Sequence, residues 1–109
     1  MKLWIDDVRP APFGYIWCKT VSQAIGFIDG QERVCATYPP GKAGSLEIEL
    51  IDIDHDAGDY ARFGGDYIKI LDWLEETGRN YPIRIHSMNP VGVANMRAII
   101  QRNGWTEVK

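Results

Sequence analysis

The sequence predicts an α/β fold, a three-layer sandwich built around a parallel β-sheet. Short segments rich in strand-forming residues alternate with segments whose apolar residues recur at helical spacing. Single helices between strands favour parallel pairing with right-handed crossovers. The chain has 109 residues, which is enough for one hydrophobic core rather than two, so we expect a single domain over residues 1–109.

Five strands and three helices are expected, in the order β-β-α-β-α-β-α-β. The strands are expected at 2–5, 15–18, 46–53, 81–85 and 105–108. The helices, counted from cap to stop, are expected at 20–30, 66–78 and 89–104. Because the connection between the first two strands is short and contains Pro10 and Pro12, the first crossover helix of a regular order is missing.

Capping residues set the expected helix boundaries. Thr20 stands three residues before Gln23, as in a capping box, and Gly30 is expected to stop this first helix. Asp66 is expected to cap the second helix. Asn89, which a proline follows, is expected to cap the third.

The middle of the chain contains a strand and a glycine-rich stretch. Segment 46–53 alternates at first and then becomes apolar on both sides, which is typical of a central strand covered on both faces. Stretch 57–65 matches neither a Walker nor a dinucleotide-binding spacing, so we expect a plain loop there. Asp52 is expected to be structural. The tryptophans are expected in the core, at positions Trp4, Trp17, Trp73 and Trp105.

Ionisable side chains follow three of the predicted strands, and this is the main functional signal. They occur as Asp6-Asp7, Asp54-His55-Asp56 and His86. In a parallel sheet all carboxyl ends of the strands lie on one edge, and ligands bind at that edge. We therefore expect one site assembled from three places in the chain.

The acidic residues of this edge suggest a metal site. Asp6 and Asp7 repel each other when buried, and a divalent cation relieves that repulsion. With Asp54 on a neighbouring strand end, three carboxylates favour Mg²⁺ or Mn²⁺ as cofactor, with carboxylate oxygens on the order of 4–6 Å apart. The alternative is that the acids cap a strand and face water.

Both histidines of the chain, His55 and His86, fall at the predicted functional edge. Histidine has an unperturbed pKa near neutrality, which suits proton transfer, and Asp56 stands beside His55. Arg9 and the helix start at Asn89 are candidate phosphate contacts. The alternatives stay open: hydrogen-bonded structural imidazoles, a surface arginine, and an asparagine that only caps its helix.

Composition excludes several classes of function. The net charge of −3 and the pI of about 5.3 do not favour binding to long nucleic acids, whereas a small phosphorylated ligand remains compatible. No apolar run is long enough to cross a membrane, and the acids near Met1 come too early for a signal peptide, which predicts a cytoplasmic protein. Cys18 and Cys35 fit neither a zinc site nor a disulfide framework. The oligomeric state stays open.

Three ordered motifs carry a resemblance that covers essentially the whole chain. They are Leu3-Trp4-Ile5-Asp6-Asp7-Val8-Arg9-Pro10, Asp54-His55-Asp56, and His86-Ser87-Met88-Asn89-Pro90-Val91-Gly92 with Asn95-Met96 after it. Together they resemble the cyclic-phosphate processing receiver-like domain family. The resemblance implies a variant of the response-regulator receiver fold with sheet order 2-1-3-4-5. It also implies processing of cyclic or otherwise phosphorylated nucleotides, in signalling or bacterial conflict systems.

The resemblance also implies roles for single residues. Asp6 and Asp7 match the acidic pair that holds magnesium in receivers, Asp54 the phosphate-accepting aspartate, and Ser87 the hydroxyl that contacts the phosphoryl group. Ordinary receivers lack the additions found here, which are His55, Asp56 and His86. The Lys-Pro pair that follows the last strand of a receiver is absent, and this argues against simple phospho-relay.

The leading interpretation is a metal-dependent phosphoesterase that hydrolyses a cyclic or phosphorylated nucleotide-type phosphoester. The expected catalytic residues are Asp54, His55, Asp56 and His86. The expected substrate contacts are Arg9, Ser87 and Asn89, and the expected metal ligands are Asp6, Asp7 and Asp54. Two alternatives are a non-catalytic module that binds a phosphorylated ligand or a partner protein, and a phospho-accepting receiver.

Overall fold

The computed structural model describes all residues from 1 to 109 and contains one parallel sheet of four strands in the order β2-β1-β3-β4. The strands are β1 (Lys2–Ile5), β2 (Tyr15–Cys18), β3 (Leu50–Ile53) and β4 (Ile83–Ile85). The α-helices are α1 (Val21–Cys35), α2 (Ile68–Glu76) and α3 (Pro90–Asn103). Two 3₁₀ helices are present, η1 (Gly44–Leu46) and η2 (Gly58–Phe63).

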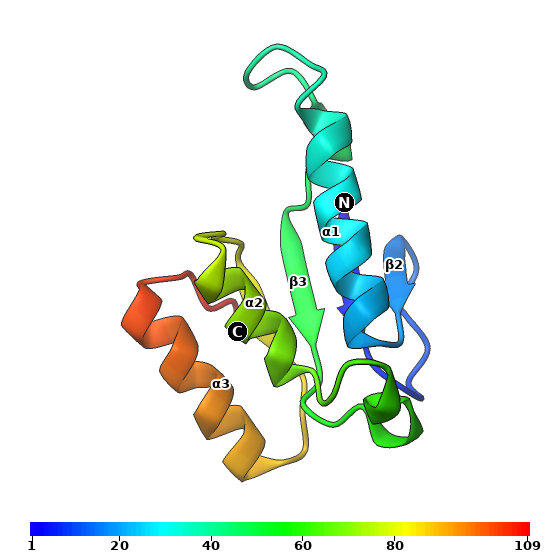
Figure 1. Cartoon of the computed structure of the whole chain (residues 1–109), viewed down its shortest axis with the longest axis vertical. Helices are drawn as coiled ribbons and strands as arrows, with labels where there is room; N and C mark the ends of the chain where they lie inside the picture. Colours follow the sequence, from blue (N-terminus) through cyan, green and yellow to red (C-terminus); the bar gives the residue numbers. More distant parts are fainter.

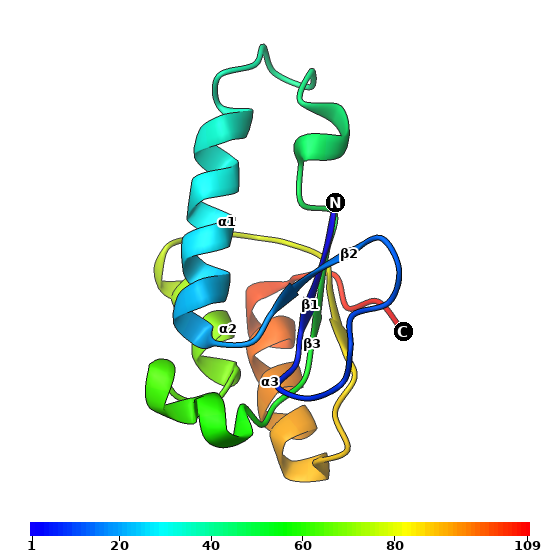
Figure 2. The ribbon, with the colours of Figure 1, turned by 90° about the vertical axis from the view of Figure 1, so that its right-hand side faces the viewer.

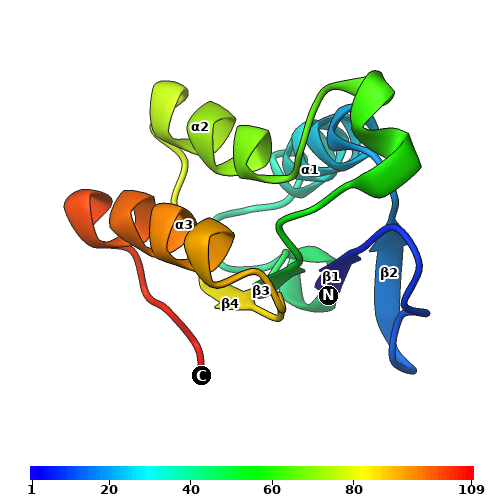
Figure 3. The same ribbon diagram turned by 90° about the horizontal axis from the view of Figure 1, so that it is seen from below.

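All three α-helices lie on the same face of the sheet (Figure 3). The core between them is formed by buried strand residues such as Leu3, Ile5 and Ile51 and by the apolar stripes of the helices. The connections from β2 to β3 and from β3 to β4 advance across the sheet in one direction, so right-handed crossovers place their helices on one side. The expected three-layer sandwich is therefore wrong, and the fold has two layers.

The other face of the sheet has no helix, because the connection from β1 to β2 is too short to form one. Segment 6–14 passes over part of this face instead (Figure 2). The indole Nε1 of Trp4 donates to the Arg9 carbonyl oxygen at 2.8 Å, which holds the segment there. Trp4 is only 9% exposed and Asp52 only 1%, although neither faces the helices. Asp52 and Trp4 thus occupy a sheltered part of the open face.

The expected fifth strand is not formed. Residues 105–108 make a single bridge, between Glu107 and Ile83, while Trp105 packs into the core. The third strand is shorter than expected because its neighbour β1 begins at Lys2, which pairs with Leu50 and leaves residues 46–49 without a full partner. The fourth strand begins only at Ile83. The sheet therefore has four strands in the order 2-1-3-4 instead of the five expected, within a receiver-like α/β fold.

Two of the predicted helix caps are confirmed, and one cap and one stop are wrong. The Thr20 hydroxyl accepts the N–H of Gln23, and the Asn89 side chain accepts the N–H of Gly92. Gly30 does not stop α1, because it keeps a helical conformation and the helix continues to Cys35. Asp66 does not cap α2; its carboxylate instead accepts the N–H of Ala57.

The carboxyl ends of the strands point to the end of the molecule where η2 and the start of α3 lie (Figure 1). Stretch 57–65, expected as a loop, contains η2, which Gly64 ends with a φ of 118°. No helix in the structure combines the length and the apolar character needed to cross a bilayer.

The segment after α3 is tied to that helix by an ion pair whose strength should depend on pH. Glu107 accepts hydrogen bonds from the Arg97 guanidinium at 2.8 and 2.7 Å, and these contacts lower the pKa of Glu107 to about 2. A carboxyl whose pKa is lower in the folded state stabilises the fold above its unfolded pKa, and this stabilisation is lost as the pH falls.

We therefore expect Glu107→Gln to lower the free energy of unfolding by about 1–2 kcal/mol at pH 7. The difference from the wild type should shrink below a pH of about 4.5 and vanish near 2, since the unfolded carboxyl has its ordinary pKa of 4.5. Urea titrations at several pH values measure this, with Glu49→Gln at an exposed position as control. A difference that stays constant with pH would contradict the assignment.

Candidate functional site

Three carboxylates converge at the carboxyl edge of the sheet. Asp6 and Asp7 follow β1 and Asp54 follows β3; the last residues of these neighbouring strands, Ile5 and Ile53, are paired. One oxygen of each of the three carboxylates lies within 4.8 Å of the others. This confirms the expected proximity of the acids. Because the donors are all hard oxygens on two adjacent chain segments, the set fits Mg²⁺.

Asp6 is fully buried, and both of its oxygens are occupied. One accepts the N–H groups of Val8 and Arg9 at 3.0 and 2.9 Å, and the other accepts the Arg9 guanidinium and Nε2 of His86 at 3.4 and 2.9 Å. Burial raises the pKa of Asp6, but the hydrogen bonds from Arg9, Val8 and His86 outweigh it and hold this pKa below its usual value. Asp6 is thus an ionised and firmly oriented group.

Asp7 is in the opposite electrostatic situation. Burial raises the pKa of its carboxyl, and the charges of Asp6 and Asp54 raise it further. Neither Asp7 nor Asp54 forms an ion pair with a protein cation. A cation from solution is the natural partner for these two carboxylates.

Gly58, the first residue of η2, lies against Asp7. Its φ is +54°, and a Cβ atom built on it would overlap with Oδ2 of Asp7. Glycine is required here both for the left-handed backbone conformation and for the close approach to the carboxylate. The glycine-rich stretch therefore shapes the acidic cluster, a role that its spacing did not reveal.

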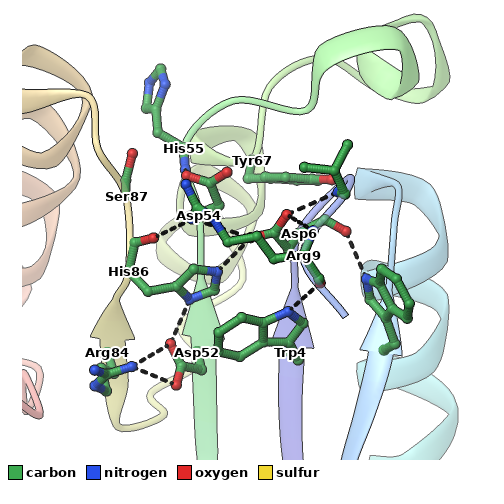
Figure 4. A network of polar contacts seen from close by, with 12 residues as sticks. Trp4, Asp6, Arg9, Asp52, Asp54, His55, Tyr67, Arg84, His86 and Ser87 are labelled. Atoms are coloured by element: carbon green, nitrogen blue, oxygen red, sulfur yellow. Dashed lines mark hydrogen bonds and ion pairs between the residues drawn. The ribbon is translucent and has the colours of Figure 1, made fainter. Parts of the chain in front are cut away.

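Tyr67 lies beside the acidic cluster (Figure 4). It is fully buried and donates its hydroxyl to the Lys19 carbonyl oxygen at 2.7 Å. Burial raises the pKa of Tyr67, and the charges of Asp7, Asp6 and Asp54 add to this effect. The phenol therefore stays neutral beside the acids.

His86 is held between two buried carboxylates. Its Nδ1 lies 2.6 Å from Oδ1 of Asp52 and its Nε2 lies 2.9 Å from Oδ2 of Asp6 (Figure 4). Because a carboxylate oxygen accepts, both ring nitrogens donate when the ring is an imidazolium. The ring also stacks on Trp4, with centroids 3.8 Å apart and planes 3° apart. His86 thus bridges two buried acids.

Arg9 is the partly exposed basic residue of the site. Its guanidinium Nη1 donates to the carbonyl oxygen of His86 at 2.9 Å and contacts Asp6. The side chain is still 43% exposed, so the rest of the guanidinium is accessible to a ligand. The structure therefore places Arg9 at the acidic cluster, as a phosphate contact requires.

The remaining predicted residues form a second group at the start of α3. His55 points away from the carboxylates (Figure 4), and its Nδ1 lies 2.8 Å from Asp56, which the Asn89 amide approaches at 3.4 Å. The hydroxyl of Ser87 accepts the N–H of Asn89 at 3.2 Å. Gly92 leaves room for the ring of His55, since a Cβ atom there would overlap with it.

The site is an open edge rather than a closed pocket. The cavity detected in the structure, of about 190 Å³, lies near the carboxyl end of α1. Its lining residues are Gln31, Glu32, Cys35, Glu47, Ile48 and Tyr81. None of the predicted site residues lines this cavity. The ionisable residues at the strand ends therefore identify the acidic edge, rather than the cavity, as the candidate functional site.

Sequence reasoning missed Asp52, Trp4, Tyr67 and Gly58 as parts of the site. Strand alternation contained a signal for two of them. Trp4, Asp52 and Arg84 stand at paired positions of adjacent strands, so they share the face opposite the core, and His86 continues that series two residues after Arg84. No comparable signal pointed to Tyr67.

Comparisons with known proteins bear on this geometry. The family of cyclic-phosphate processing receiver domains matches residues 1–102. The comparison with curated proteins found no match, and neither did the comparison with solved structures. The match covers nearly the whole chain and includes every strand end that contributes to the site, so the chain belongs to the family of cyclic-phosphate processing receiver domains.

Proposed function

We propose that this domain binds Mg²⁺ or Mn²⁺ at its acidic cluster and hydrolyses a cyclic or otherwise phosphorylated nucleotide-type phosphoester. One observation carries the proposal: three carboxylates lie within 4.8 Å of one another, and two of them lack a protein cation. Membership of the family supports a phosphate ester as the ligand.

Asp7 and Asp54 are the proposed direct metal ligands. Asp6 contributes charge and orientation, because its oxygens already accept from two backbone N–H groups, Arg9 and His86. When bound, the metal polarises a phosphoryl oxygen and lowers the pKa of a water ligand.

Side chains around the cluster are proposed to hold the phosphate. Arg9 offers its accessible N–H groups, and the Ser87 hydroxyl can donate while its oxygen accepts from Asn89. The amino-terminal turn of α3, capped by Asn89, adds the positive end of a helix dipole. These groups come from two different strand ends and face the same edge.

Two histidines are candidates for proton transfer, and their surroundings differ. Nδ1 of His55 is held by Asp56 while its Nε2 makes no hydrogen bond, which leaves that nitrogen free for a ligand. Both nitrogens of His86 are engaged by carboxylates, so His86 reaches a ligand only if Nε2 releases Asp6. We therefore assign proton transfer to the His55–Asp56 pair.

Mg²⁺ should raise the melting temperature of the wild type, because a ligand that binds only the native state stabilises it. Asp7→Asn with Asp54→Asn should abolish this response. Without Mg²⁺ the double variant should melt above the wild type, since the raised pKa of Asp7 means that its ionised form destabilises the fold at pH 7. Asp59→Asn, an exposed acid of η2, is the control. A full Mg²⁺ response in the double variant would remove these residues from the metal site.

Gly58→Ala should weaken Mg²⁺ binding by about 10-fold, because the new methyl group displaces the Asp7 carboxylate. Gly41→Ala is a matched control: its φ is also positive, at +75°, but a Cβ atom there meets nothing within 4 Å. Both variants bear similar backbone strain, so calorimetric Mg²⁺ titration isolates the effect on Asp7. Equal Mg²⁺ affinities in the two variants would contradict the proposed role of Gly58 in placing the Asp7 carboxylate.

A screen of cyclic mononucleotides and 2′,3′-cyclic phosphates with Mg²⁺ should reveal turnover by the wild type. At saturating Mg²⁺, His55→Ala should lower kcat roughly 10²–10⁴-fold, the usual effect of removing a positioned acid or base. His86→Ala is measured in parallel. A loss of kcat in His86→Ala but not in His55→Ala would assign proton transfer to His86 instead. Mg²⁺ binding without turnover of any compound would favour the non-catalytic binding module.

A further inference from the structure

We infer that Asp52 is a positioning residue of the acidic site, which it reaches through His86 although it is not itself at the edge. Asp52 fixes the imidazole so that Nε2 holds Asp6, the carboxylate beside the two proposed metal ligands. The inference rests on the proposed function for its metal and adds a residue that contacts neither the metal nor the substrate.

Asp52 is a buried carboxylate with two partners, His86 and Arg84. Its carboxylate is 1% exposed and lies within β3, whose neighbouring residues on either side belong to the apolar core. Oδ1 lies 2.6 Å from Nδ1 of His86, and Oδ2 accepts from the Arg84 guanidinium at 3.0 Å. A buried carboxylate is costly to keep unless it is paired, and here a ring and a guanidinium pair it.

Trp4 restricts the orientation of His86, because the stacked indole allows the imidazole ring only one plane. The indole and the imidazole are parallel within 3° and lie 3.8 Å apart. The indole itself cannot turn freely, since its Nε1 donates to the Arg9 carbonyl oxygen at 2.8 Å. With its plane set by Trp4 and its Nδ1 set by Asp52, the ring directs Nε2 at Oδ2 of Asp6.

The result is a continuous path of contacts across three strand segments. It runs from Asp52 in β3 through His86 after β4 to Asp6 after β1. Asp6 lies within 4.8 Å of the proposed ligands Asp7 and Asp54. Loss of a hydrogen-bonded group just outside the ligands of a metal usually weakens metal binding 10–100-fold. Asp52 therefore influences the metal site from the sheltered side of the sheet.

The first test observes the ring directly and needs no metal. In the wild type, the proton between Nδ1 of His86 and Asp52 should give a downfield imidazole N–H signal, because the contact is short and its acceptor is a carboxylate oxygen. His86→Gln assigns the signal by removing it. Asp52→Asn should move or abolish it, whereas Arg84→Gln, which removes the other partner of this carboxylate, at 3.0 Å from Oδ2 and 3.3 Å from Oδ1, should leave it in place. An unchanged signal in Asp52→Asn would overturn the inference.

The second test measures Mg²⁺ affinity in a double-mutant cycle. Asp52→Asn and His86→Gln should each weaken binding by about 10-fold, and the double variant should bind no more weakly than His86→Gln alone. This non-additivity is expected because Asp52 acts only through His86. Losses that multiply in the double variant would show a general structural effect and overturn the positioning role.

Arg84→Gln is the matched control for the cycle, because Arg84 contacts Asp52 but not His86. Its Mg²⁺ affinity should equal that of the wild type. If the wild type itself binds no Mg²⁺, the proposed metal site fails, while the imidazole signal of the metal-free protein still decides whether Asp52 positions His86.

Discussion

The contact of His86 with two buried carboxylates is the interaction on which the site depends. Asp6 and Asp52 are at most 1% exposed, and each would be costly to bury alone. The imidazole places one nitrogen at each of them and joins β1, β3 and β4 at one point. The ring contacts Asp6 through Nε2 and stacks on Trp4, and the His86 carbonyl oxygen accepts from Arg9, so these three residues meet at His86.

The two-layer architecture makes this arrangement possible. With all helices on one face, alternate strand residues on the other face need not be apolar, and Asp52 and Arg84 occupy such positions. Segment 6–14 lies on this side of the sheet in place of a helix and is tied to Trp4 by a hydrogen bond (Figure 2). The short connection between β1 and β2 thus has a functional consequence, since a helix packed there would require an apolar surface beneath it.

The basic side chains at the acidic cluster are distributed unevenly among its carboxylates. The two that contact the cluster are Arg9 and His86. Both contact Asp6, so Asp7 and Asp54 retain uncompensated charge. That asymmetry separates one structural carboxylate from two that are available for a metal.

The sequence by itself determined the order of the elements, the caps at Thr20 and Asn89, and the three strand ends that bear the ionisable residues. These features depend on local periodicity, on capping chemistry and on the rule that parallel strands end at one edge. The convergence of Asp6 with Asp54 followed from that rule.

Tertiary structure decided the rest. The fifth strand and the stop at Gly30 were expected from local signals, but strand length depends on whether a neighbour is present, and a glycine continues a helix when packing favours it. The number of layers depended on crossover direction, which needs the strand order. The pairing of Asp52 with His86 joins residues 34 positions apart, so only the folded chain could turn a structural aspartate into a partner of the site.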